Sequence, residues 1–161
     1  MSKGTIAGTE FEKPRGVSGV EVREGYAQVH VQNLSEPVAG NRLDALKLVS
    51  NADISLDFLK LTHKGLSFLV PEALADTAQE CLQQSGAEVS VACGRSIVLV
   101  HAVNIREEEG LLARLVSIAI GEGVPVEHVA DMHDRMLLVT DDASARRLAA
   151  AYEREFLGAR K

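Results

Sequence analysis

Hydrophobic and polar positions alternate in two pairs of short segments that lie about 70 residues apart. The first pair covers residues 18–23 and 26–34, the second covers 87–92 and 96–103, and a glycine, Gly25 or Gly94, interrupts each pair. Such alternation predicts half-buried strands, and the glycine predicts a tight turn between them. Residues 26–34 are apolar on one face only, which favours a sheet that helices cover on one side.

Each predicted strand pair is followed by a helix, two further strands and a second helix. The first helices are predicted over 41–51 and 110–122, because apolar residues recur there every three or four positions. These residues are Leu43, Leu46 and Val49 in one helix, and Leu111, Leu112, Leu115, Ile118 and Ala119 in the other. The strands are predicted over 54–62 and 65–70, and over 124–132 and 135–139. The closing helices have shared apolar faces made by Leu74, Ala78, Cys81 and Leu82, and by Ala145, Leu148, Ala149, Tyr152 and Phe156.

An internal repeat relates the two halves. The segment VEVREGYAQV (20–29) aligns without a gap with VSVACGRSIV (89–98), an offset of 69 residues. A repeat of this period indicates one structural unit used twice. The pattern therefore predicts an α+β protein of two ferredoxin-like units, each ββαββα with a four-stranded antiparallel sheet and helices on one face. We expect a tail or linker over 1–15, a first unit over 16–86 and a second over 87–161.

Composition narrows the function classes. The chain has 161 residues, is 46% hydrophobic and carries a net charge of −6, which argues against a nucleic-acid scaffold. Its two cysteines give no disulfide framework, no apolar run reaches the length of a membrane span, and the N-terminal residues have no apolar stretch that resembles a signal peptide. These features favour a cytoplasmic protein.

Catalytic, cofactor and metal motifs are not found in the sequence. Neither a Walker loop nor a G-x-G-x-x-G segment occurs, so no nucleotide site is predicted. The polar segment 127–134 lacks three ligands with a recognised metal spacing on one strand face, which favours a solvated strand. His101 is better explained as a hydrogen-bonded interior or interface histidine than as a base. An RNA-binding sheet would need stacking aromatic residues, and the corresponding strand positions are Val, Gln, His and Leu.

The order of motifs resembles the ACT domain, a small amino-acid-sensing module. The resemblance is carried by VLVHAV, Gly110, ARLVSIAIGEGVPV and MLLVTDDASARRLAAAYEREF in the second half, and by VSGVEVREGYAQVHVQNL, DISLDF and LSFLVPEAL in the first. It covers about residues 16–157 and is similar to the paired ACT domains in the regulatory half of aspartokinase. It implies a non-catalytic homodimeric protein that needs no cofactor or metal. Such a protein would bind a small amino acid of the lysine or threonine class at an ACT–ACT interface and modulate a catalytic partner enzyme.

The resemblance also implies where the amino acid would bind. The first pocket would use the turn before the first helix and the strand beside it: Asn33, Ser35, Glu36, Val38, Ala39, Gly40, Asn41, Leu61 and Thr62. A second pocket would use Glu109, Gly110, Ala130 and Asp131. Backbone N–H groups at the helix start would meet the ligand carboxylate, and nearby acids or carbonyls its ammonium.

Two other interpretations stay open at this stage. Ala39 stands where the family has Pro, Leu61–Thr62 replaces Gln-Asn, and Glu109–Gly110 replaces Pro-Gly. These departures favour an ACT pair that has lost its ligand and serves in assembly. The acids 107–109 are equally explained as an exposed turn that favours a helix N-terminus.

Overall fold

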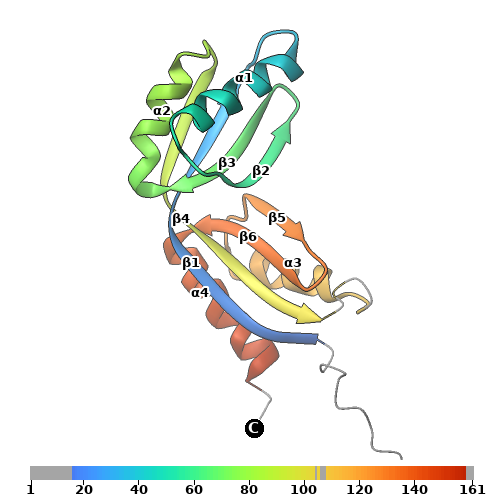
Figure 1. Ribbon diagram of the computed structural model, residues 1–161. Coiled ribbons are helices and arrows are strands. Elements are labelled where there is room, and N and C mark those ends of the chain that lie inside the picture. Colours follow the sequence, from blue (N-terminus) through green and yellow to red (C-terminus); the bar gives the residue numbers. More distant parts are fainter. Residues whose placement is uncertain (1–15, 104, 106–107, 159–161) are drawn as a thin grey trace, which may run out of the picture. The chain divides into compact units, whose positions relative to one another are not determined.

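The computed structural model describes residues 16–103, 105 and 108–158, so the predicted tail 1–15 lies outside the described residues (Figure 1). Four helices and six strands follow one another along the described residues, which confirms an α+β protein. In order they are β1 (Gly16–Gln32), α1 (Val38–Asn51), β2 (Asp57–Thr62), β3 (Gly65–Pro71), α2 (Ala75–Gln83), β4 (Glu88–Val103), α3 (Leu111–Gly121), β5 (His128–Asp131), β6 (Arg135–Asp141) and α4 (Asp142–Tyr152). A 3-10 turn, Glu72–Leu74, precedes α2, and a π-helical turn, Glu153–Leu157, follows α4.

The two predicted hairpins at Gly25 and Gly94 are wrong. Both glycines have positive φ, 87° and 67°, but each lies inside one continuous long strand, β1 or β4. Beyond Gly25 the chain pairs with β3 instead of folding back on residues 18–23. A single left-handed glycine can twist a strand without reversing it, so alternation around a glycine did not distinguish a bend from a turn.

The chain forms two compact units. The α1–α2 unit consists of residues 23–97 and 140–143, and the α3–α4 unit of 1–22, 98–139 and 144–161, as far as these are described. This grouping differs from the division predicted at residue 87, because β1 and β4 each contribute to both units. The hydrogen-bonded strand order is β2-β3-β1-β4-β6-β5 in one six-stranded sheet, in place of two separate four-stranded sheets.

The core of the α1–α2 unit lies between its strands and its two helices. Antiparallel pairing of β1 with β3 sets Ala27 beside Val70, Val29 beside Phe68 and Val31 beside Leu66, and all six side chains are buried. The predicted apolar face of β1 is therefore confirmed. Helix α1 adds Ala45 and Val49 to this core. Leu43 is 53% exposed, so its predicted place in the apolar stripe of α1 is wrong.

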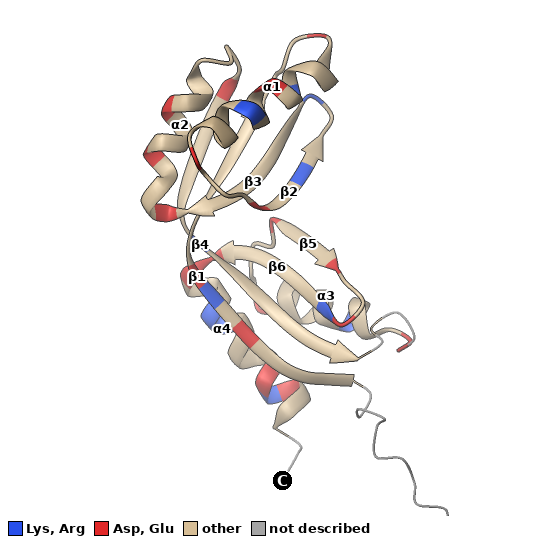
Figure 2. Ribbon diagram, in the orientation of Figure 1, with Lys and Arg blue, Asp and Glu red and all other residues tan. Residues whose placement is uncertain are grey.

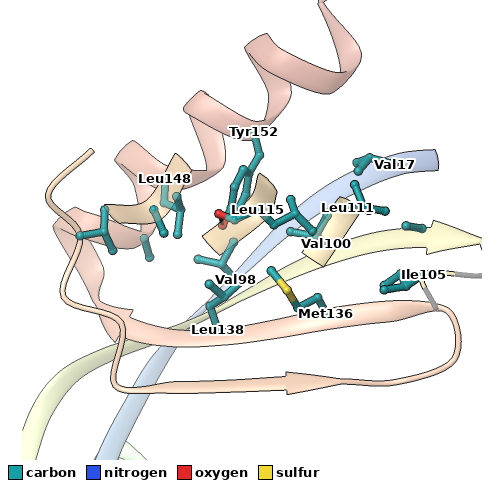
Figure 3. Packing of buried hydrophobic residues seen from close by; sticks show 14 residues of the cluster. Val17, Val98, Val100, Ile105, Leu111, Leu115, Met136, Leu138, Leu148 and Tyr152 are labelled. Carbon is teal, nitrogen blue, oxygen red and sulfur yellow. Dashed lines mark hydrogen bonds between the residues drawn. The ribbon is translucent and has the colours of Figure 1, made fainter. Parts of the chain in front are cut away.

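The core of the α3–α4 unit joins β4, β6 and the two helices (Figure 3). Leu111, Leu115 and Ala119 of α3 are buried as predicted, whereas Leu112 is 40% exposed, so the predicted stripe was one residue too wide. Tyr152 of α4 is fully buried and its hydroxyl donates to the Leu115 carbonyl at 2.8 Å. Burial raises the pKa of Tyr152, so the phenol stays protonated and keeps this bond.

No helix within the described residues is both long enough and apolar enough to cross a membrane.

Candidate functional site

The predicted binding turn of the α1–α2 unit runs from the end of β1 into α1 and is fixed by local hydrogen bonds. Asn33 has a positive φ of 54°, and its side-chain amide donates to Glu88 Oε2 at 2.8 Å. Asn41 donates from its side chain to the Ser35 carbonyl at 2.8 Å, closing the turn over the first residues of α1. Ser35 and Glu36 are exposed, while Leu34 between the strand and the turn is buried in the core.

The N-terminus of α1 already has a carboxylate beside it, that of Glu36 in the preceding turn. Helix α1 begins after Pro37, which offers no side-chain cap, and the Val38 N–H donates to Glu36 Oε2 at 3.3 Å. Val38 is half-buried, and Ala39 and Gly40 are exposed. A carboxylate at this position favours the helix N-terminus, and it would oppose the approach of a second carboxylate.

Beside this turn lies the hairpin between β2 and β3, with Leu61 and Thr62 at the end of β2. Both are exposed, and Leu61 pairs with Leu66 while Thr62 pairs with Gly65. The guanidinium of Arg42 on α1 donates to the carbonyls of Thr62, His63 and Gly65, the latter two at 3.1 and 3.0 Å. Arg42 therefore ties the start of α1 to the hairpin, a role the sequence did not reveal.

A shallow hollow of about 390 Å³ lies where the end of β1 meets this hairpin. Its lining residues are Gln32, Asn33, Thr62, His63 and Lys64. The structure thus brings two predicted residues, Asn33 and Thr62, to one depression. Gln32, His63 and Lys64 were not predicted, and the only sequence signal for them is a basic dipeptide in a hairpin of an acidic chain.

The second predicted pocket draws on separate elements of the α3–α4 unit. Gly110 precedes α3 with a φ of 74°, and its carbonyl accepts from the Arg114 N–H at 2.9 Å. Glu109 is exposed. Ala130 and Asp131 lie on β5, where they pair with Leu137 and Met136 of β6. That these two groups form one pocket stays a prediction.

The acids before α3 are only partly described. Glu107 lies outside the described residues, and Glu108 is half-buried. Glu108 Oε2 is inaccessible to solvent and has no hydrogen-bond partner within the described part of the chain. A carboxylate near this helix start would oppose an anion there, as at α1.

Charged side chains on or next to the strands of the α3–α4 unit pair with one another. His101 is half-exposed and lies 3.3 Å from Glu21 Oε2, and Asp134 forms an ion pair with Arg135 at 2.9 Å. The hydrogen bond from Arg135 holds the pKa of Asp134 below its usual range. Over residues 16–103, 105 and 108–158, no three His, Cys, Asp or Glu side chains gather as metal ligands would.

Exposed large apolar side chains lie on two helices and on or next to the two edge strands. Among the described residues they are Leu43 of α1, Leu59 and Leu61 of β2, Leu112 and Ile120 of α3, Val129 of β5, and Met132 just after it. Strands β2 and β5 are the edge strands. Exposed edge strands with apolar side chains can pair with another chain.

Comparisons with known proteins identify the fold. No protein-family model matches the chain, and no curated protein matches it in sequence. Solved structures do match. A chain from the structure of the aspartokinase alpha and beta subunits is 17% identical, and the match covers 86% of this chain and 97% of that one with a TM-score of 0.79. The regulatory subunit of aspartate kinase from Thermus thermophilus is 18% identical, and the match covers 87% of this chain and 97% of that one with a TM-score of 0.78. Aspartate kinase from Clostridium acetobutylicum matches over 92% of this chain and 37% of its own, at 9% identity and a TM-score of 0.81. The chain thus shares the fold of aspartokinase regulatory subunits, as the sequence resemblance predicted.

Proposed function

We propose that this chain is a non-catalytic, amino-acid-sensing regulatory protein that modulates a partner enzyme of the aspartokinase type. One observation carries the proposal: the fold matches regulatory-subunit chains over 97% of their length. The proposed effector is a small amino acid of the lysine or threonine class. Regulation then means that the effector binds one arrangement of the protein better than another.

The proposed binding site is the turn from Asn33 to Asn41 together with the end of β2. The hollow that contains Asn33 and Thr62 supports this placement, because it is concave and its lining residues carry polar side chains. The turn is exposed, so a neighbouring ACT unit could complete the site, as the predicted ACT–ACT interface requires.

A homodimer is part of the proposal and is supported by the apolar edge strands. Light scattering on the full chain should give twice 17.3 kDa, and a mass near 17.3 kDa at high concentration would exclude the dimer. Leu61→Lys should lower the mass, because Leu61 is 58% exposed on edge strand β2. Lys60→Ala on the same strand serves as the matched control and should leave the mass unchanged.

The second candidate function is an assembly module without a ligand. It is supported by Glu36, whose carboxylate accepts from Val38 N–H where an effector carboxylate was expected. Calorimetry with the twenty amino acids separates the two candidates. Saturable heat from one or a few of them supports sensing, whereas no heat from any of them together with a stable dimer supports assembly.

A further inference from the structure

The hairpin turn between β2 and β3 is held in one position from two sides. A Cβ atom added to Gly65 would lie 1.9 Å from the Val31 carbonyl oxygen, so β3 approaches β1 more closely there than any other residue would permit. On the strand side, the Leu34 N–H donates to the Lys64 carbonyl at 2.9 Å. On the helix side, Arg42 donates to three carbonyls of the turn. Because the turn is fixed in this way, its exposed side chains are held in place before any ligand binds.

These bonds also decide which polar groups the turn can offer. All four successive carbonyls from Thr62 to Gly65 accept hydrogen bonds from within the unit, from Arg42 or from Leu34. Carbonyl oxygens are the groups that would repel an anion, and here each already has a donor. What remains toward solvent are the exposed side chains of Thr62, His63 and Lys64, in a chain whose net charge is −6.

Basic side chains line the hollow, and a carboxylate lies next to one of its lining residues. The side-chain amide of Asn33 donates to Glu88 Oε2 at 2.8 Å, so a carboxylate is hydrogen-bonded to a residue that lines the hollow. His63 and Lys64 line the hollow on the hairpin side. Figure 2 shows further basic positions on α1 and β2 of this unit. A small zwitterion bound there would be near charges of both signs.

We infer that the effector carboxylate binds at the hairpin side of the hollow, to Lys64 and His63 with Gln32 of β1 beside them. It does not bind at the N-terminus of α1. The ammonium group then lies toward Asn33 and Glu88. This inference rests on the proposed function and reverses the polarity expected from the sequence, where the helix start took the carboxylate. The reversal follows from Glu36, because its carboxylate already accepts from Val38 N–H and would repel a second one.

Amide NMR on the nitrogen-labelled chain tests the inference with three probes: acetate, methylammonium and the amino acid with the largest calorimetric heat, or glycine if none gives heat. Acetate should shift the amide resonances of His63, Lys64 and Gly65 saturably, and methylammonium should not. Lys64→Ala should weaken acetate binding about fivefold, the ratio that corresponds to roughly 1 kcal/mol for one exposed charge pair. Lys60→Ala is the matched control on the same hairpin and should leave the affinity unchanged.

Each outcome decides one of the two claims. Acetate shifts centred on residues 38–40, or no saturable shift at the hairpin, overturn the inference. An amino acid that binds with shifts at 38–40 and is indifferent to Lys64→Ala overturns the inference but leaves the proposed function standing. Acetate bound at the hairpin with no response to any amino acid supports an anion site and overturns amino-acid sensing. A thermal unfolding curve of Lys64→Ala that matches the wild type shows that loss of binding is not loss of fold.

Discussion

In both units a backbone N–H near the end of the long strand donates to a carbonyl of the hairpin turn, but the turn is basic in one unit and internally neutralised in the other. In the α1–α2 unit the Leu34 N–H donates to the Lys64 carbonyl at 2.9 Å, and in the α3–α4 unit the Ala102 N–H donates to the Asp134 carbonyl at 2.9 Å. The turns read THKG (62–65) and MHDR (132–135), so a lysine in one corresponds to an aspartate in the other. Asp134 is neutralised by its own neighbour Arg135, whereas Lys64 has an exposed side chain that no described acid pairs with.

An arginine near the start of the first helix also differs in use between the units. Arg42 of α1 reaches the hairpin and satisfies its carbonyls. Arg114 of α3 instead reaches the π-helical turn after α4, where its guanidinium carbon lies 4.9 Å from the ring centre of Phe156 and the side chain pairs with Glu155. The two units thus share a backbone pattern but use their helix arginines differently. In the α1–α2 unit the arginine binds the hairpin, and in the α3–α4 unit it binds the turn after the second helix.

The largest effect that tests this comparison is expected at the core of the α3–α4 unit. Leu115→Ala should lower the free energy of unfolding by about 2–5 kcal/mol, because Leu115 is fully buried between α4 and the sheet. Chemical denaturation measures it. The matched control is Leu112→Ala on the same helix, 40% exposed, which should cost clearly less. Equal losses at the two positions would contradict the helix register in the structure.

The next effect concerns the close approach in the α1–α2 unit. Gly65→Ala should destabilise by about 1–3 kcal/mol or more, because its Cβ would collide with the Val31 carbonyl oxygen and neither backbone can move freely. Gly19→Ala is the matched control in a strand, since nothing lies within 4 Å of its added Cβ. Thermal melts compare the two. The hairpin contact described above would be disproved by a Gly65→Ala protein as stable as the control.

Sequence patterns predicted the elements better than their connections. The face of β1 made by Ala27, Val29 and Val31 and the buried positions of α4 could be predicted because amphipathic periodicity follows from one-sided burial. The continuation of β1 through Gly25 and of β4 through Gly94 could not be predicted. Whether a glycine twists or reverses a strand depends on which distant strand pairs with it.

The candidate site shows the same limit at the level of side chains. Asn33 and Thr62 were predicted from the resemblance, and both line the hollow. Arg42 and Lys64 were missed, because their roles come from the meeting of α1 with a hairpin some 20 residues later. The contrast of THKG with MHDR was visible in the sequence, but that both turns accept a backbone hydrogen bond from a long strand or its end was not.

A smaller effect tests the polar link between the helices of the α3–α4 unit. Tyr152→Phe should cost about 0.5–1.5 kcal/mol, since it removes the hydroxyl that donates to the Leu115 carbonyl. Denaturant unfolding measures the loss. Tyr26→Phe, at a half-buried tyrosine of β1, is the control and should change stability less. A stabilised Tyr152→Phe protein would show that the ring, rather than the hydrogen bond, fixes α4.

The smallest effect separates the two hairpins directly. Arg135→Gln should raise the pKa of Asp134 toward the ordinary carboxyl range, because the hydrogen bond from Arg135 is the main cause that lowers it. A depressed pKa in the folded state stabilises the protein above the pKa of the unfolded chain, and this contribution is lost as the pH falls through the folded value. Both groups are on the surface, so the change in stability should be slight while the change in pKa is measurable by carboxyl NMR titration. Arg147→Gln, at an exposed position of α4, is the control and should leave the pKa of Asp134 unchanged. If Arg135→Gln also leaves it unchanged, the neutral character of this hairpin does not come from its ion pair. The charge contrast with Lys64 would then need another cause.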